Sequence, residues 1–390
     1  MNKESLLAVL KKNAMLIILV LVYLFFLIVT KGGIFSPSNF SELINQNAYV
    51  YILGAGMLMC MLTGGNIDLS CGAFVCLLGA LGGLFMVIYG MSTGVSLLLM
   101  LLIGIAYGVG LGFLIAYVHI PPWIATLAGF LSFRGLGTSI LSANSKTGSL
   151  SFASKTDFQS LFYGRVFPSE PNVLNWPCFL LGIALALAVV LGVFLTRRNR
   201  LAKGYEADSL RTAIIKSCLG GGAIVLVMSK LAMDGGLPTV LIWVAGIIVF
   251  YSFITSRTTI GRHFYVVGGN MEAARLSGVN TRRIMFLAYL NMAVLTSIAT
   301  FTVIARSQSA YADIGKNFEM DAISACVVGG VSASGGAGTV LGMVIGATLI
   351  GVINLGMSLI SLDANYQRVV KGFVLLAAVV FDILSKKRKG

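Results

Sequence analysis

The sequence predicts an all-α polytopic membrane protein that forms a single transmembrane domain over residues 1–390. Hydrophobic residues make up 57% of the chain and charged residues 11%, against roughly 45–50% and about 25% in soluble domains. The chain contains 46 glycines but only 7 prolines, which fits closely packed membrane helices. A soluble fold of this size would need far more charge on its surface, so most water-soluble classes are excluded.

The apolar runs give the order of the membrane spans. A hydrocarbon core of about 30 Å requires about 20 apolar residues per helix. Runs near that length lie at residues 14–30, 48–63, 71–89, 95–118, 123–141, 177–196, 213–233, 238–255, 284–305, 337–360 and 366–384. The segment 320–334 is too short and too broken by glycine for an ordinary span. We therefore expect about twelve crossings, including short or broken helices.

The positive charge is clustered in particular connections. The chain has 28 Lys and Arg against 14 Asp and Glu, a net charge of +14. The basic clusters precede residue 14, fill the connections 197–216 and 257–283, and close the chain at 386–389. Cytoplasmic loops of membrane proteins carry such an excess. The pattern places both termini and both connections in the cytoplasm if 320–334 crosses the membrane, and we expect no nucleic-acid partner.

The first apolar run is expected to be a retained helix. Basic residues followed by an apolar stretch also describe a signal peptide. Residues 14–30 continue into Lys31-Gly32-Gly33 without a small-x-small cleavage signature. This favours retention, with a cleaved signal peptide as the alternative.

Residues suited to catalysis or metal binding are scarce. The six cysteines lie in or beside apolar runs and form no CxxC pair, so we expect buried free thiols. Only His119 and His263 are present, which argues against a histidine-based relay. The nearest approach to a P-loop, at 330–335, lacks the lysine that would reach a phosphate. We expect no metal, no cofactor and no nucleotide-binding site in this chain.

Two connections are too long to be simple turns. Residues 142–176 are rich in Ser, Asn and Pro and fall outside, and residues 256–283 are basic and fall inside. Long loops in compact proteins are usually functional or disordered. We therefore expect partners to bind at a periplasmic loop, 142–176, and a cytoplasmic loop, 256–283, with residues 306–318 as a further outer candidate.

Two similar interruptions occur in the two halves of the chain. The first reads Gly64-Gly65-Asn66-Ile67-Asp68-Leu69-Ser70, and the second reads Gly329-Gly330-Val331-Ser332-Ala333-Ser334-Gly335-Gly336. Each lies between apolar segments. Paired interrupted helices indicate two related halves, with irregular backbone lining a transport route. Two tight turns between neighbouring helices are the alternative.

Four polar residues near these interruptions are candidates for the pathway or its gate: Asn66, Asp68, Ser70 and Asp321. Asp68 has a second interpretation, because a carboxylate can accept hydrogen bonds from the free N–H groups at the start of the next helix. Capping is the favoured role. Arg134 is expected near the outer mouth, paired with a carbonyl or an acid.

The cytoplasmic loop contains a predicted two-turn helix. Asn270 is a good N-cap, Glu272 suits the positive end of a helix dipole, and Gly278 suits a left-handed stop. So short a helix is unstable alone in water and normally docks against something. An amphipathic connector without a partner is the alternative.

This stretch resembles the coupling-helix motif of the membrane permeases of bacterial ATP-binding-cassette (ABC) importers for monosaccharides, the ribose, galactose and xylose group. The resemblance continues through Gly64-Gly65-Asn66-Ile67-Asp68-Leu69-Ser70, Pro122-Trp123-Ile124-Ala125-Thr126-Leu127, Arg134-Gly135, Glu319-Met320-Asp321-Ala322-Ile323, Gly329-Gly330 and Ser334-Gly335-Gly336, and covers about residues 48–385. The ATPase-coupling residues that it implies are Gly268, Gly269, Asn270, Glu272, Ala273, Ala274 and Gly278.

The resemblance also implies partners and a location. These are a cytoplasmic ABC ATPase, a periplasmic or lipid-anchored sugar-binding protein, a second copy of the permease and a monosaccharide substrate, at the bacterial inner membrane. Residues 177–233 add a helix pair that smaller relatives lack. This addition resembles the larger xylose and multiple-monosaccharide permeases, which favours those sugars over ribose without identifying one.

An ion-coupled secondary transporter that works without an ATPase is the alternative function. Such a transporter usually carries ionisable residues deep within its spans. The candidate carboxylates Asp68, Asp321, Asp363 and Asp382 all lie near the ends of predicted spans. The sequence therefore favours the ATP-driven importer.

Overall fold

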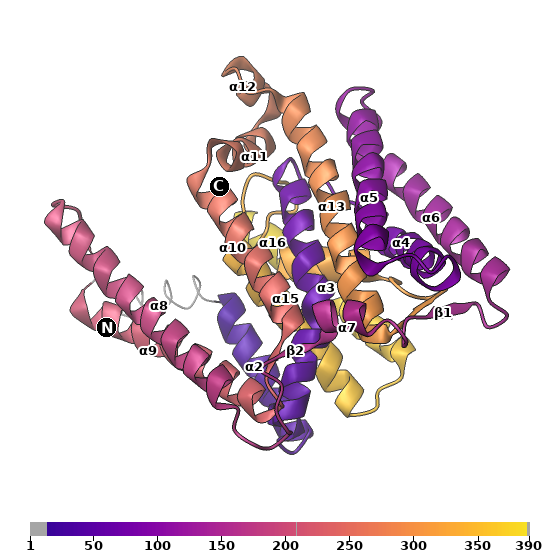
Figure 1. The fold of residues 1–390 in the computed structure, drawn as a ribbon. Helices are drawn as coiled ribbons and strands as arrows, with labels where there is room; N and C mark the ends of the chain where they lie inside the picture. Colours follow the sequence, from indigo (N-terminus) through magenta and orange to yellow (C-terminus); the bar gives the residue numbers. More distant parts are fainter. Residues whose placement is uncertain (1–13, 208, 388–390) are drawn as a thin grey trace.

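The computed structural model describes residues 14–207 and 209–387 and consists almost entirely of helices (Figure 1). The helices are α2 (Ala14–Val29), η1 (Gly33–Phe35), α3 (Pro37–Leu62), α4 (Cys71–Gly83), η2 (Leu84–Ile88), α5 (Thr93–Ala116), α6 (Pro122–Asn144), α7 (Thr156–Tyr163), α8 (Trp176–Ala202), α9 (Leu210–Met233), α10 (Thr239–Arg257), α11 (Thr259–Gly269), α12 (Met271–Leu276), α13 (Thr281–Ser307), α14 (Phe318–Val328), α15 (Val340–Leu359) and α16 (Ala364–Lys387). The strands are β1 (Ser149–Ser151), β2 (Arg165–Val166), β3 (Leu237–Pro238) and β4 (Ser309–Tyr311). The predicted all-α class is confirmed.

Among the described residues, eight helical segments are long and apolar enough to cross a membrane. They are α4 continued through η2, α5, α6, α8, α9, α10, α13 and α15. Helix α2 is apolar but has only 16 residues, and α3 and α16 begin with polar residues. The count of about twelve crossings stays a prediction. The basic side chains at the two chain ends, which support the predicted orientation, lie outside the described part.

Helix α3 begins at Pro37, well before the start predicted at residue 48. Ser36 caps it, accepting a hydrogen bond from Asn39 N at 3.4 Å, and proline is favoured at the first helical position. Its first turns are polar, which is why hydropathy alone missed them. One of these polar residues, Glu42, pairs with Arg306 on α13.

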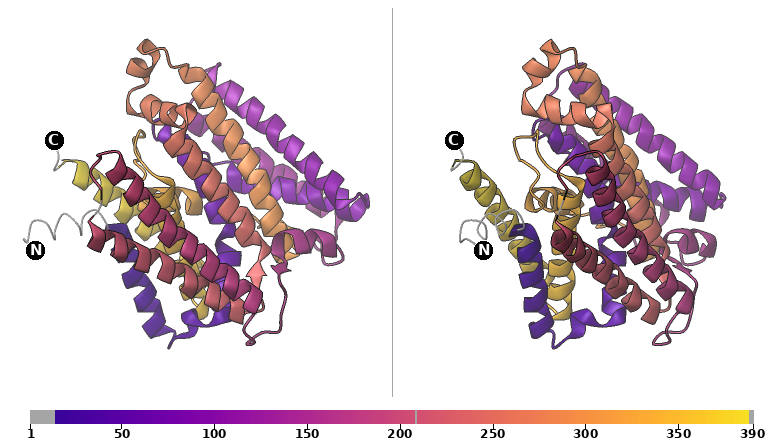
Figure 2. Two further views of the ribbon diagram at one scale, coloured as in Figure 1. Left: turned by 60° about the vertical axis from the view of Figure 1, so that its left-hand side comes forward. Right: turned by 90° about the vertical axis from the view of Figure 1, so that its left-hand side faces the viewer.

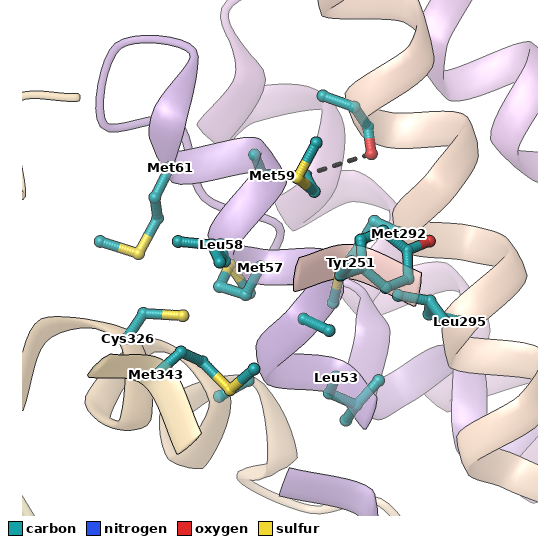
Figure 3. Packing of buried hydrophobic residues seen from close by; sticks show 14 of the residues in the cluster. Leu53, Met57, Leu58, Met59, Met61, Tyr251, Met292, Leu295, Cys326 and Met343 are labelled. Carbon is teal, nitrogen blue, oxygen red and sulfur yellow. Dashed lines mark hydrogen bonds between the residues drawn. The ribbon is translucent and has the colours of Figure 1, made fainter. Parts of the chain in front are cut away.

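The core surrounds the second half of α3. Figure 3 shows methionine and leucine side chains of α3 packed against Tyr251 on α10, Met292 on α13, Cys326 on α14 and Met343 on α15. Methionine is flexible enough to fill irregular gaps between crossing helices. Five of the six cysteines are buried free thiols as predicted, whereas Cys218 is exposed on α9.

Small residues bring α5 close to α13. A Cβ at Gly104 would overlap Ser297 Oγ, and a Cβ at Gly108 would lie 2.9 Å from Leu290 Cα. Glycine at every fourth position therefore allows close approach of the two helices, as in other membrane helix pairs.

Helix α14 is the short, broken segment predicted at 320–334. It has 11 residues, and such a helix rises about 16 Å, roughly half of the hydrocarbon thickness. It ends at Gly329 and Gly330, and Gly330 has a φ of 84°, a conformation that side chains disfavour. Irregular backbone then leads to α15.

The two predicted outer segments meet in a small sheet. Strand β1, from the 142–176 connection, pairs antiparallel with β4, with Leu150 opposite Ala310. The same connection supplies β2, which pairs with β3. Segments that are far apart in the sequence therefore form one surface.

Helices α8 and α9, at the left of Figure 1, form the helix pair predicted at 177–233. They pack along each other and are anchored to the rest of the protein near the β2–β3 end. There Lys230 Nζ lies 3.7 Å from the centre of the Phe35 ring, and Arg165 pairs with Asp234 at 2.5 Å. Figure 2 shows the pair from two further sides.

Candidate functional site

The predicted surface helix is present as α12, a six-residue helix at one end of the molecule (Figure 1). Asn270 Oδ1 accepts a hydrogen bond from Ala273 N at 2.9 Å, so the predicted N-cap is confirmed. Glu272 lies in the first turn and Arg275 in the last, where their charges complement the helix dipole. The two side chains also pair at 3.6 Å.

The end of α12 is a Schellman motif built on Gly278. Gly278 N donates to Arg275 O and Val279 N donates to Ala274 O, both at 3.0 Å. Gly278 has a φ of 84°, the left-handed conformation that glycine adopts without steric cost. The predicted stop is confirmed.

The exposed surface of α12 carries two apolar side chains beside the Glu272–Arg275 pair. Leu276 is 80% exposed and Met271 is 45% exposed, whereas Ala274 is fully buried against the protein. A helix this short cannot sustain itself by its own hydrogen bonds. Among the described residues, α12 packs against the protein through Ala274, and its outer face is exposed and available to a partner.

Helix α11 connects α12 to the two interruptions. Gly336 N, in the second interruption, donates to Leu62 O at the end of α3 at 3.1 Å. A Cβ at Gly268, in the last turn of α11, would overlap Leu62 O and lie 2.6 Å from Gly336 N. Only glycine permits this approach. We call the contact of Gly268 with Leu62 and Gly336 the junction.

The two interruptions also touch each other beside the junction. A Cβ at Gly65 would overlap Ala333 O, and a Cβ at Gly335 would overlap Gly64 Cα. Gly64, Gly65 and Gly335 all have positive φ values, 118°, 74° and 85°. The two breaks that are similar in sequence are therefore neighbours in space.

Side chains of α11 stabilise its position at the junction. Phe264 and Val267 are buried in the core, and Tyr265 OH donates to Gly338 O at 3.0 Å. Burial raises the pKa of Tyr265, so its hydroxyl stays protonated and remains a donor at neutral pH. Helix α11 is therefore attached to the backbone that leads into α15.

A cavity of ≈ 890 Å³ lies between α12 and the first interruption. The end of α3, the α5–α6 connection, α12 and the start of α13 line it, with Asn66 and Glu272 on its wall. Asn66 Nδ2 donates to Thr63 O at 3.1 Å, so it also fixes the turn after α3.

Asp68 and Ser70 form a buried network in front of α4. Asp68 Oδ1 accepts hydrogen bonds from Ser70 N at 2.8 Å and Ser70 Oγ at 2.5 Å. Ser70 Oγ lies 2.6 Å from Tyr107 OH on α5. Asp68 thus accepts the N–H of Ser70, the residue just before α4, rather than an N–H in the first turn of α4, which was the favoured expectation.

Asp321 lies in a separate place, on α14. It is 3% exposed and its Oδ1 pairs with Lys371 Nζ on α16 at 2.9 Å. Its Oδ2 accepts a hydrogen bond from Tyr49 OH at 2.6 Å. The structure therefore does not gather Asn66, Asp68, Ser70 and Asp321 into one site.

Replacing Lys371 with methionine is expected to lower the melting temperature of the purified protein strongly. Removing one partner of a buried ion pair costs roughly 3–5 kcal/mol, because the remaining charge is buried and unpaired. The double variant D321N/K371M should recover most of the loss. A single variant that melts like the parent would show that the pair contributes nothing.

Sequence reasoning missed Glu319 as a candidate. It is 3% exposed, and its Oε2 has no hydrogen-bond partner among the described residues. A Cβ at Gly72 would overlap this oxygen, so α4 begins close to the start of α14. Its position two residues before the candidate Asp321 was the sequence feature that could have identified it. Arg134 was predicted correctly to pair with carbonyls, since its Nη1 donates to Ala312 O and Ile314 O at 3.0 and 2.7 Å.

Comparison with known proteins identifies the family. A family model described as branched-chain amino acid transport system / permease component matches residues 39–379. The xylose transport system permease protein XylH of Haemophilus influenzae is 31% identical over 380 residues, which cover 96% of each chain. XylH of Escherichia coli is 31% identical over 374 residues, 96% of this chain and 92% of that protein.

Ribose permeases are also similar. The ribose import permease protein RbsC of Bacillus subtilis is 30% identical over 346 residues, 89% of this chain and 85% of that protein. No solved structure matches the chain. The chain belongs to this family of transport-system permeases, and it is a multi-pass membrane protein. The predicted resemblance to the xylose and ribose permeases is confirmed.

Proposed function

We propose that this permease is the membrane subunit of an ATP-driven, binding-protein-dependent importer that carries a monosaccharide across the bacterial inner membrane. The observation that carries the proposal is the continuous route from α12 through α11 to the junction. A separate cytoplasmic ABC ATPase would dock on α12 and hydrolyse ATP, since this chain has no P-loop lysine. The permease itself performs no chemistry.

The coupling residues would act in two groups. Asn270, Glu272, Ala273, Ala274 and Gly278 form and cap α12, which offers Leu276 and Met271 to the ATPase. Gly268 allows the end of α11 to contact Leu62 and Gly336 closely. Gly269 provides the link between α11 and α12. Movement of α12 would then shift the end of α3 and the backbone that leads into α15 together, because Leu62 and Gly336 meet at the junction.

Asn66, Asp68, Ser70 and Asp321 are proposed to shape the pathway or its gate. Asp68 and Ser70 fix the start of α4, next to the first interruption. Asp321 fixes α14 against α16 through Lys371. Asn66 lines the cavity beside α12, where a released solute would leave. Asn66, Asp68 and Ser70 hold irregular backbone in position, as expected for a route lined by broken helices.

A monosaccharide is the favoured solute, with xylose or several sugars preferred. The named relatives that span almost the whole chain are xylose and ribose permeases, although the family model is named for branched-chain amino acids. Uptake of labelled xylose, ribose, galactose and leucine by vesicles that hold the complete transporter tests this. Xylose should compete with the other sugars, and uptake of leucine alone would contradict the proposal.

The sugar-binding protein is proposed to dock on the surface made by β1 and β4, with a permease homodimer framing the central path. Replacing Tyr311, which is 42% exposed on β4, with alanine should lower binding-protein-stimulated ATP hydrolysis several-fold while basal hydrolysis stays unchanged. Exposed aromatic residues often dominate such interfaces.

Y205A is the matched control for this prediction, because Tyr205 is 63% exposed in the basic α8–α9 connection, on the proposed cytoplasmic side. Stimulation that is equal in Y311A and the parent would remove this docking surface.

A further inference from the structure

The α8–α9 pair carries a groove whose composition changes along its length. The groove has a volume of ≈ 450 Å³. Its α8 wall runs from Val189 through Gly192 to Arg200, and its α9 wall contains Ala213 and Lys216. The α8 residues recur at spacings of three and four, so they share one helix face. One end of the groove is apolar and the other is basic.

Three cations line the basic end: Arg197, Arg200 and Lys216. The adjoining ends of α8 and α9 and the connection between them add Arg198, Lys203 and Arg211 against only Glu206 and Asp208 in the sequence. Basic residues between membrane helices at the cytoplasmic side attract anionic lipid headgroups. The positive-inside pattern places this end of the groove at that interface.

The whole groove is about as long as one leaflet is thick. Residues 189 to 200 of a helix span about 16 Å, roughly the thickness of one leaflet's hydrocarbon layer. Val189, Gly192 and Val193 provide the apolar end, which spans about 6 Å of this length. The groove therefore offers an apolar channel to a lipid tail and a cluster of positive charge to its phosphate.

The second groove between the same helices makes a contrast. It has a volume of ≈ 360 Å³, shares no residue with the first and is lined by no charged residue. Of these two grooves, only the first is therefore lined by positive charge.

The described residues leave the basic end of the pair uncovered. The contacts of α9 with the rest of the protein lie near its other end, around Met228 and Leu237. Near the basic end, Leu195 is 53% exposed, and Ile215 and Leu219 are 58% and 69% exposed. Exposed apolar side chains on a membrane helix are suited to contact with lipid, and such contact would leave the groove open to the bilayer.

We propose that this groove binds an anionic phospholipid of the cytoplasmic leaflet, with an acyl chain along Val189 and Val193 and the phosphate held by Arg197, Arg200 and Lys216. The lipid fills the space between the two added helices and fixes their cytoplasmic ends. The site does not depend on which solute the permease carries.

The first test removes the charge. The variant R197Q/R200Q/K216Q and the control R198Q/K203Q/R211Q lose the same charge from the same helix pair, but only the first changes the groove. Phosphatidylglycerol bound to the detergent-purified protein is measured by native mass spectrometry, with phosphatidylcholine and inorganic phosphate as comparison ligands. The groove variant should bind phosphatidylglycerol roughly a hundredfold more weakly, and the control should bind like the parent.

The second test fills the groove and leaves every charge in place. Gly192 and Gly222 both face open space, and they lie in the basic and the apolar groove respectively. G192W should abolish retention of phosphatidylglycerol, whereas G222W should leave it unchanged.

Three results would overturn the proposal. They are equal losses in both charge variants, which would indicate diffuse surface attraction; equal retention by G192W and the parent; and displacement of the lipid by inorganic phosphate alone.

Discussion

Replacing Gly268 with alanine is expected to abolish ATP-driven uptake while the protein still inserts into the membrane. The new Cβ would overlap Leu62 O and crowd Gly336 N, both of which are backbone atoms that cannot rotate away. Overpacking of this kind costs roughly 1–3 kcal/mol and forces the backbone to shift. The junction would open, and α11 could no longer transmit movement of α12 to α3 and α15. Uptake by vesicles that contain the whole transporter is the measurement.

Gly246, on α10, supplies the matched control for this prediction. It lies outside the coupling residues, and a Cβ there would meet nothing within 4 Å. G246A should therefore transport at nearly the parental rate. Equal uptake by G268A and the parent, with both proteins present at equal amounts in the membrane, would refute a mechanical role for the junction.

Replacing Gly278 with valine is expected to separate ATP hydrolysis from uptake. The left-handed conformation costs a β-branched residue about 1–2 kcal/mol. Helix α12 has only six residues, so the loss of its C-terminal cap would destroy the shape of its outer face. Space is not the cause, since a Cβ at Gly278 would meet nothing within 4 Å. Binding of the purified ATPase should weaken by at least about tenfold.

The conservative variant G278N distinguishes backbone conformation from other effects. Asparagine tolerates the left-handed conformation better than valine does. G278N should retain most of the uptake and of the ATPase binding. If valine and asparagine behaved alike, the Schellman motif would not be the reason that glycine is needed.

The coupling helix could be predicted from sequence because its determinants are local. Asn270 and Gly278 cap a helix by bonding to residues three to five positions away, so their pattern is readable in one dimension. The bounds of the apolar spans were predictable for the same reason. Helix α3 was the exception, since its polar first turns carry residues such as Glu42 that are stabilised by distant partners.

The junction could not be predicted, because it joins residues that are more than 200 positions apart. The sequence contains the glycines, but no pattern in it predicts that Gly268 contacts Leu62. The pairing of Asp321 with Lys371 and the burial of Glu319 are also tertiary facts. The burial of Asp68 is a tertiary fact of the same kind, since its position near the end of a predicted span did not indicate it.

The central claim is that ATP hydrolysis by a separate subunit drives uptake of the sugar. Uptake by reconstituted vesicles, with ATP and ion gradients supplied separately, tests this claim most directly. The permease is combined with its purified ATPase and sugar-binding protein, and labelled xylose is offered. The account predicts uptake with ATP, no uptake when either partner is omitted, and no response to a proton or sodium gradient. Uptake by the permease alone that follows an ion gradient without ATP would contradict it.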